Sequence, residues 1–383
     1  MEHCNFLSEQ TLRYWLVRIG AREDMSEVLC EAARRISADH RLKDLFLAEQ
    51  RLHGEHNQWH RSWDPLPMDE VVTQAMPEPS QFYYLSYLSA LPWTLRRYQE
   101  MGIPEQIFDH TMAQLPFMFL EKYDATGRWV YTGFGWIWRH LSAELFRLGR
   151  IQYMAIQYPR AERLFRRKAD GEFVMLCDPD LDLREDGWAN GAGGRFDTSW
   201  RGVFTETDDS WTGNPLHREG YVLKDVVTLP KSQWELVLEK GDWVLDLHIP
   251  KDGSFTPDEC RVSIAMAEQF YQTHFPRIRP KALYCHTWLF TAQLTEFLPA
   301  GSNILAFQDE FYRMPTAGSV SFLWSFVFGE GVTRETAPRD TTLRRSVLDH
   351  LDRGGEIFDL CGITLRDSDS WGKALKHDGA QAD

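Results

Sequence analysis

The first part of the chain carries apolar residues at the three- and four-residue spacing of amphipathic helices. Ser8, and then the pair Asp24 and Glu27, are capping signals that start two helices within residues 8–55. Residues 57–80 contain several prolines and predict a loop. Further helices are predicted at 81–101, with a kink at Pro92, at 104–123 and at 134–148. This part of the chain is therefore predicted to be almost wholly helical.

The pattern changes at Gly149, after which apolar residues alternate with others as they do in half-buried strands. Asp170 and Gly171 mark the turn of a hairpin. From 243 to 313 strands and helices alternate, which is the order of a mixed α/β sheet. The predicted strands are 151–158, 163–167, 173–177, 234–238, 243–249, 282–290 and 320–328, and the predicted helices are 256–275, 303–313 and 341–352. The whole chain is thus predicted to have an α+β fold.

Residues 243–275 form the most clearly patterned unit, a strand, a tight loop and a helix. The strand ends at Pro250, and the loop 251–255 leads to Thr256, which is an N-cap with Glu259 three residues later. Free backbone N–H groups in such a loop, next to the positive end of a helix, suit phosphate oxygens. The unit is either a candidate anion site or an ordinary capped helix after a tight turn.

A second unusual stretch, residues 178–225, is rich in glycine, aspartate and tryptophan. A loop of this length inside a domain is usually functional or disordered. Its tryptophans favour an ordered, packed loop. We expect either a lid or substrate-facing wall, or a purely structural excursion.

Composition narrows the functional classes. The 383 residues are 43% hydrophobic and 26% charged, as in a globular protein of two or three domains. The formal net charge of −14 argues against a nucleic-acid partner, because binding phosphates requires a basic surface. An anionic ligand would likewise need a local basic patch.

Targeting and metal signals are missing from the sequence. No apolar run has the length of a membrane span, and the first 15 residues lack the apolar core of a signal peptide. The six cysteines are scattered without a CxxC pair, so no metal site is predicted. A cytoplasmic protein with reduced thiols and no membrane partner is the simplest expectation.

Five short motifs in a fixed order carry a family resemblance. They are Leu148-Gly149-Arg150-Ile151-Gln152-Tyr153, Leu247-His248-Ile249-Pro250 with Gly253, Cys285-His286-Thr287-Trp288-Leu289, Leu298-Pro299 with Ser302-Asn303-Ile304, and Arg339-Asp340-Thr341-Thr342-Leu343 with His350-Leu351. With these motifs, the chain resembles a bacterial acyltransferase family that has a helical N-acyltransferase N-terminal domain and a GNAT-like C-terminal domain. The resemblance implies a helical domain at 1–147, a GNAT-like domain at 148–370 and a polar tail at 371–383.

The resemblance also implies a site for acyl-CoA as co-substrate, with no metal. In GNAT enzymes the pantetheine pairs with the central strand, and the diphosphate lies on loop amides before the next helix. The cofactor-binding residues implied here are Ile249, Pro250, Lys251, Gly253, Ser254, Arg261 and Asn303. The chain departs from the usual glycine-rich loop because Gly253 stands alone, and Asp258 and Glu259 lie in the first helical turn. An ordinary capped helix after a tight turn is the alternative interpretation.

Three residues are candidates for the chemistry. His248 near the end of the strand is the candidate general base, because an imidazole with a pKa of about 6.5 can accept a proton from an amine. The resemblance implies Tyr312 as the candidate general acid for the leaving thiolate, because GNAT enzymes often have a tyrosine in this role on the corresponding helix. The alternatives are a histidine that only orients the loop and a packed aromatic residue. Cys285 next to His286 suggests a nucleophile, but adjacent strand residues point to opposite faces, and a buried cysteine is the commoner outcome.

The sequence therefore predicts an N-acyltransferase that moves an acyl group from acyl-CoA, or from a carrier-protein thioester, to a small-molecule or peptide amine by direct attack. The helical part and the 178–225 loop would shape the acceptor pocket. An acyl carrier protein is a candidate partner. The first alternative is a non-catalytic binding protein for a small molecule or acyl-CoA on a GNAT-like scaffold, and the second is a thioesterase or acyltransferase that uses Cys285.

Overall fold

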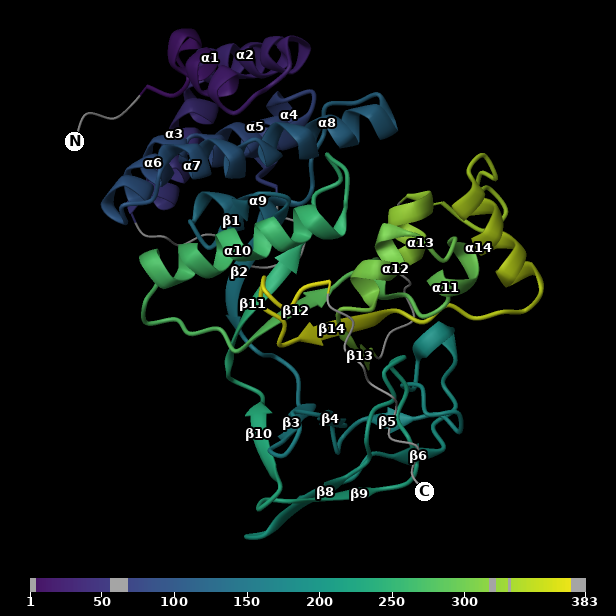
Figure 1. Cartoon of the computed structure of the whole chain (residues 1–383). Helices are drawn as coiled ribbons and strands as arrows, with labels where there is room; N and C mark the ends of the chain where they lie inside the picture. The colour runs from purple at the N-terminus through teal and green to yellow at the C-terminus, as the bar shows by residue number, and fades with distance from the viewer. Residues whose placement is uncertain (1–4, 56–67, 317–321, 330–331, 373–383) are drawn as a thin grey trace. The chain divides into compact units, whose positions relative to one another are not determined.

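The computed structural model describes residues 5–55, 68–316, 322–329 and 332–372. Contacts divide the chain into two units, residues 1–148 and residues 149–383. The first unit is built almost entirely of helices, and the second is built around a mixed sheet (Figure 1). This confirms the predicted α+β fold.

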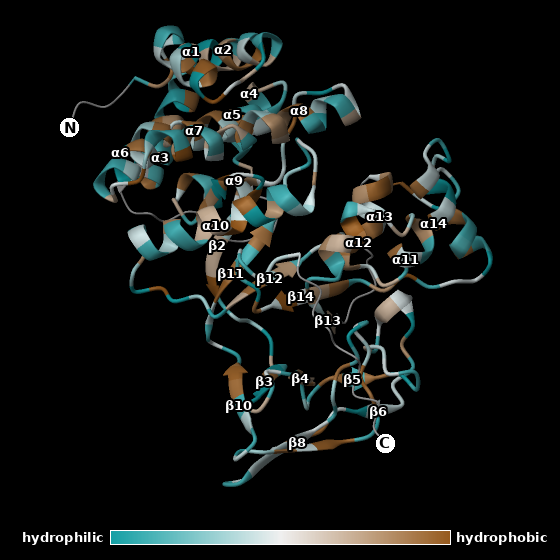
Figure 2. Ribbon diagram, viewed as in Figure 1, coloured by the Kyte–Doolittle hydropathy of each residue, from teal (hydrophilic) through white to brown (hydrophobic). Residues whose placement is uncertain are grey.

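The N-terminal unit consists of short helices followed by one strand. Most of these helices bury one face, and brown and teal segments accordingly lie side by side along them in Figure 2. The elements are α1 (Glu9–Arg18), α2 (Glu23–Ala38), α3 (His40–Glu55), α4 (Glu70–Ala75), α5 (Pro79–Leu88), α6 (Leu91–Glu100), α7 (Glu105–Met112), α8 (Gln114–Thr126), α9 (Phe134–Leu141) and β1 (Leu145–Leu148).

Several predicted helices are divided in the structure. The second helix starts at Glu23 rather than at the predicted capping pair, and it ends before Asp39, whose carboxylate accepts the N–H of Arg41 at 2.9 Å at the start of α3. Pro92 lies in the first turn of α6 and starts a new helix instead of kinking a continuous one. The predicted helix 104–123 is interrupted at Ala113, between α7 and α8.

Two further expectations for this unit were wrong in part. The last predicted helix ends at Leu141, the chain turns at Ala143 with a φ of 56°, and residues 145–148 form strand β1. Of the predicted loop 57–80, residues 57–67 lie outside the described residues, and α4 together with the start of α5 occupies much of the rest.

Five strands of the C-terminal unit lie in its central sheet in the order β2-β11-β12-β14-β13. β11 and β12 are parallel, and the other neighbouring pairs are antiparallel. Their bounds are β2 (Ile151–Gln157), β11 (Trp243–His248), β12 (Ala282–His286), β13 (Tyr312–Pro315) and β14 (Leu360–Thr364). The predicted strand–loop–helix at 243–275 is confirmed, which places the candidate anion site at the centre of this sheet.

Helix α10 (Pro257–His274) covers one face of the sheet (Figure 1). Its Ser263 hydroxyl accepts the N–H of Ile151 at 3.0 Å, and the hydroxyl of Tyr271 donates to the carbonyl of Tyr153 at 3.3 Å. Both contacts are to β2, so the helix is fixed on the strand that neighbours β11. The loop between β11 and α10 is therefore held at both of its ends.

Smaller sheets extend the unit. A hairpin of β3 (Arg163–Arg167) and β4 (Phe173–Leu176) confirms the predicted turn at 170–171, and β10 (Trp234–Leu238) joins it. The long insert is ordered and contains short strands and one turn of helix. They are β5 (Asp182–Leu183), η1 (Ala192–Gly194), β6 (Trp200–Arg201), β7 (Phe204–Glu206) and β8 (Ser210–Gly213), and β9 (Val227–Pro230) follows the insert.

The last part of the chain differs most from the prediction. The strand predicted at 282–290 ends at His286 and continues as η2 (Trp288–Phe290), and the helix predicted at 303–313 is only α12 (Asn303–Gln308). The strand predicted at 320–328 is helix α13 (Phe322–Phe328) where it is described, and residues 320–321 lie outside the described residues. With α11 (Leu294–Phe297) and α14 (Thr342–Asp352), these helices share an apolar core that includes Leu323 and Phe328.

Among the described residues, no helix has the length and apolar character that crossing a bilayer requires.

Candidate active site

The parallel pair β11 and β12 separates at its carboxyl end. Pairing stops at Asp246 and Tyr284, although each strand continues for two more residues. Beyond that point β11 stays with β2, up to the pair His248 and Gln152, while β12 stays with β14, up to His286 and Cys361. The sheet therefore opens between residues 247–248 and residues 285–286, and backbone groups of both strands face this opening.

Cys285 lies in the opening. Its thiol donates to the carbonyl of Leu247 at 3.2 Å, so that carbonyl points from β11 towards β12. Burial raises the pKa of the Cys285 thiol well above its ordinary value. A nucleophile needs the thiolate, which this environment disfavours, so the geometry fits a buried structural cysteine.

In the loop after β11, several carbonyl groups accept hydrogen bonds, whereas several N–H groups make none in the described part of the chain. The guanidinium of Arg150 donates to the carbonyls of Pro250, at 2.7 Å, Gly253, at 3.2 Å, and Ser254. In the described part of the chain, the N–H groups of Gly253, Ser254 and Phe255 make no hydrogen bond. Three successive donors thus remain available next to the start of α10.

The start of α10 is a capping box. The Thr256 hydroxyl accepts the N–H of Glu259, and the Glu259 carboxylate accepts the N–H of Thr256 at 3.0 Å. The hydroxyl of Ser254 also donates to Glu259, at 2.6 Å. These hydrogen bonds lower the pKa of Glu259, so its carboxylate stays charged beside the loop. The predicted cap is confirmed, and it accounts for one of the two acidic residues in the first turn.

His248 and Asp246 lie on the same face of β11, at the edge of the opening. His248 Nε2 is 3.1 Å from Asp246 Oδ2, a contact that is short but not aligned as a hydrogen bond. The side chains are 27% and 13% exposed, but His248 Nε2 itself is buried. His286 stands on the same sheet face across the opening, and burial lowers its pKa while Asp246 acts in the opposite direction. An imidazole beside a carboxylate can accept a proton and have the resulting charge stabilised.

The chain matches two known protein families. Residues 145–364 match the family described as a GNAT-like C-terminal domain, which is more than half of the chain, and residues 10–143 match the N-acyltransferase N-terminal domain. The chain belongs to the GNAT-like C-terminal domain family. No curated protein matches the sequence at a significant level.

Solved structures share the fold over most of the chain. An acyltransferase mutant in complex with octanoyl-CoA is 20% identical with a TM-score of 0.62, covering 93% of this chain and 87% of its own. An acyltransferase in complex with CoA and 10C-teicoplanin is 20% identical with a TM-score of 0.62, covering 92% and 86%. An acyltransferase in complex with decanoyl-CoA and teicoplanin is 20% identical with a TM-score of 0.61, covering 93% and 87%.

Within the GNAT-like domain, Tyr312 does not join His248. It lies on strand β13, not on the predicted helix, and three strand spacings, about 14 Å, separate β13 from β11. The Tyr312 hydroxyl donates to the carbonyl of Phe173 at 2.8 Å, and burial raises its pKa to about 12. The structure therefore brings one of the two predicted catalytic residues to the opening.

The predicted cofactor-binding residues surround the loop to different degrees. Ile249 and Pro250 follow directly after β11, and the Lys251 ammonium lies 5.0 Å from the ring centroid of Phe326 on α13. Arg261 is exposed on α10, with its Nε 3.8 Å from Asp258. Asn303 is exposed at the first position of α12, and α12 reaches the loop through the rings of Phe255 and Phe307, whose centroids are 4.9 Å apart.

Sequence analysis missed Arg150 and Asp246 as members of the site. The motif 148–153 contained Arg150, but its role depends on a loop 100 residues later in the chain. Asp246 lies two residues before His248 in the same strand, and the alternation of side chains along a strand, which places both on one face, is the signal that could have identified it.

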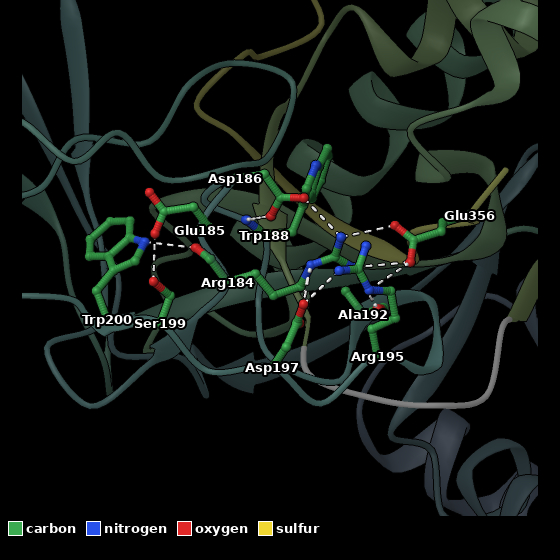
Figure 3. Close-up of polar contacts among 10 residues, drawn as sticks. All are labelled: Arg184, Glu185, Asp186, Trp188, Ala192, Arg195, Asp197, Ser199, Trp200 and Glu356. Atoms are coloured by element: carbon green, nitrogen blue, oxygen red, sulfur yellow. Dashed lines mark hydrogen bonds and ion pairs between the residues drawn. The ribbon is translucent and has the colours of Figure 1, made fainter. Parts of the chain in front are cut away.

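The insert 178–225 of the GNAT-like domain is held by a buried guanidinium (Figure 3). Arg184 is 2% exposed and donates to Glu356 at 2.9 Å, to Asp186 at 2.8 Å and to the carbonyl of Ala192 at 3.2 Å. The rings of Trp188 and Phe358 stack with centroids 4.3 Å apart. This network attaches the insert to residues 356–358.

A surface hollow of about 600 Å³ lies at the start of β12, between the end of α10 and residues 365–367. Its lining includes Tyr271, Pro276 and Lys281. It is at the end of β12 opposite to the opening, so it is not part of the site described above.

Proposed function

We propose that the chain is an acyl-CoA-dependent N-acyltransferase. The observation that carries this proposal is the opening between β11 and β12, followed by a loop whose N–H groups at 253–255 are available. Such donors at the start of a helix suit the oxygens of a diphosphate. Beyond Leu247, whose carbonyl accepts from the Cys285 thiol, the separated strand offers backbone groups to a pantetheine arm. Membership of the GNAT-like family supports the same assignment.

The proposed cofactor contacts come from β11, the loop and the following helices. Ile249 and Pro250 would line the pantetheine arm, and the N–H groups of Gly253 and Ser254 would hold the diphosphate. A Cβ on Gly253 would meet only Arg150 Nε, at 3.9 Å, and the φ of this residue is not positive. Packing and backbone conformation do not explain the glycine, whereas close approach of a ligand does. Lys251, Arg261 and Asn303 complete the proposed set.

In the proposed reaction the amine nitrogen attacks the thioester carbonyl carbon. The new N–C bond forms, the C–S bond breaks, and the sulfur leaves as the thiolate of CoA. His248 accepts the proton that the amine loses, and Asp246 stabilises the imidazolium that results. Positioning of the two substrates contributes the rest of the rate enhancement. No residue of the chain becomes acylated, in keeping with the buried Cys285 thiol.

The substrates are proposed only as classes. The acceptor is a small-molecule or peptide amine, and the solved structures with octanoyl-CoA, decanoyl-CoA and teicoplanin support testing medium acyl chains and large peptide-like acceptors first. A carrier-protein thioester remains the alternative donor. A cytoplasmic location is proposed as well, because the described cysteines are free thiols.

The first test is direct. Thermal shift and calorimetry with CoA, acetyl-CoA, octanoyl-CoA and decanoyl-CoA measure binding, and release of free CoA thiol with an amine panel measures transfer. Binding of CoA together with amine-dependent thiol release is the expected result. If no CoA species binds, the proposed function is wrong.

A binding protein without catalysis is the second candidate. Phe255 at the end of the loop packs on Phe307 of α12, and the charged Glu259 lies beside the loop. Both features would weaken cofactor binding. CoA binding with no thiol release across the amine panel would favour this second function.

A further inference from the structure

Arg150 binds the loop 250–255 that follows β11, and the cofactor contacts proposed for this loop do not include it. It follows Gly149 in the turn before β2, and its side chain reaches across to the loop after β11. Its guanidinium donates to three loop carbonyls, those of Pro250, Gly253 and Ser254. Its Cζ also lies 5.5 Å from the ring centroid of Phe255.

Three carbonyls that converge on one cation fix the direction of the peptide groups between them. A peptide unit is planar and its C=O and N–H point in opposite directions. The carbonyls of Gly253 and Ser254 point towards Arg150, so the N–H groups of Ser254 and Phe255 point away from it. These are two of the three N–H groups that make no hydrogen bond in the described part of the chain.

The charge of Arg150 also matters for an anionic ligand. The loop and the first five residues of α10 carry Lys251 and Arg261 against Asp252, Asp258 and Glu259. Without Arg150 this region is net negative, and with it the charges balance. The pKa of Glu259 is lowered mainly by its hydrogen bonds from Ser254 and Thr256, and charge attraction to Arg150 lowers it further.

We propose that Arg150 is a positioning residue for the diphosphate of CoA, which binds the loop carbonyls from behind, directs the loop N–H groups outward and offsets the acidic first turn of α10. The inference rests on the proposed function, because it names how the same site accepts its co-substrate. Arg150 is not proposed to take part in proton transfer.

The test compares Arg150→Gln and Arg150→Lys with the matched control Arg166→Gln. Arg166 makes an exposed ion pair with Glu235, at 2.7 Å, on the small sheet. Calorimetry with CoA should show a dissociation constant raised roughly 10- to 100-fold in Arg150→Gln, because several charge-assisted hydrogen bonds are lost. Arg150→Lys should recover part of that loss, since it restores the charge but not the planar fork. Arg166→Gln should bind like the unaltered protein.

Two further measurements distinguish positioning from a general structural role. Inhibition by pantetheine, which lacks the diphosphate, should be nearly unchanged in Arg150→Gln. The KM for acyl-CoA should rise while kcat at saturation stays close to its original value. Equal loss of CoA and pantetheine affinity, or unchanged CoA affinity in a folded Arg150→Gln protein, would overturn the inference. Failure of the unaltered protein to bind CoA would instead reject the proposed function.

Discussion

The insert 178–225 and the loop 250–255 use their polar groups in opposite ways. In the insert, the buried guanidinium of Arg184 is surrounded by Glu356, Asp186 and a backbone carbonyl, all from the protein itself. In the loop, Arg150 binds the carbonyls, and the adjacent N–H groups make no hydrogen bond in the described part of the chain. Apart from its Nε, which lies 3.7 Å from Asp197 without a hydrogen bond, the guanidinium of Arg184 is paired within the protein. Such pairing stabilises structure, whereas donors that the protein leaves available can be used by a ligand. Of the two segments that the sequence marked as unusual, the loop is therefore the stronger functional candidate.

The largest expected effect is at the opening. His248→Ala should lower kcat about 100- to 10,000-fold, because the amine loses its proton acceptor. CoA affinity, measured by calorimetry, should stay close to that of the unaltered protein. His274→Ala, at the far end of α10, is the control and should leave kcat unchanged. Unchanged turnover in His248→Ala would remove His248 as the base.

The next effect concerns stability in the insert. Arg184→Met should lower the free energy of unfolding by about 2 kcal/mol, since it removes the shared partner of the Glu356 and Asp186 carboxylates and leaves Glu356 only Arg195, at 3.4 Å. These carboxylates are partly exposed, which keeps the cost below that of a fully buried pair. Urea unfolding measures the loss, and proteolysis should cut within 178–225 more readily. If Arg184→Met abolished CoA binding without changing stability, the insert would have a role in ligand binding, and the contrast with the loop 250–255 would be wrong.

The control for that experiment lies in the same insert. Arg201→Gln removes an exposed ion pair with Asp182, at 2.8 Å. It should change the free energy of unfolding by less than about 1 kcal/mol. A loss as large as that of Arg184→Met would show that any charge change in the insert has this effect, and would contradict the special role of the buried guanidinium.

These contrasts show what could be inferred from the sequence. The capping box at Thr256 and the β11–α10 unit were predictable because their signals are local and strong. The segment 322–328 was assigned to the wrong class because a short apolar run fits a buried strand and a buried helix equally well. Tyr312 was predicted to lie on a helix, but that helix ends at Gln308. The distance of Tyr312 from His248 therefore could not be predicted. The role of Arg150 depends on contacts between distant segments, which no spacing rule reports.

A smaller effect is expected at Cys285. Cys285→Ala should lower the free energy of unfolding by about 1 kcal/mol, because the hydrogen bond to the Leu247 carbonyl is lost. Turnover should fall little, since the raised pKa of the buried thiol keeps it protonated. In the unaltered protein, iodoacetamide at pH 8 should modify Cys285 only after unfolding, as peptide mass analysis can show. Loss of activity with an intact fold would revive covalent catalysis through this cysteine.

The smallest effect on turnover is expected at Tyr312, which is either a packed aromatic residue or the general acid. Its hydroxyl donates to the Phe173 carbonyl and joins β13 to β4, which is the role of a packed aromatic residue. Tyr312→Phe should therefore change kcat by less than about twofold and cost about 1 kcal/mol of stability. A general acid for the leaving thiolate would instead lose about 100-fold in kcat, with a changed basic limb of the pH–rate profile. Measuring kcat from pH 6 to 10 for both proteins decides between these outcomes, because a tyrosine whose pKa is raised to about 12 stays protonated over that whole range. A large loss in Tyr312→Phe would mean that β13 approaches the reaction centre in the working enzyme. The catalytic residues would then not be confined to the opening between β11 and β12.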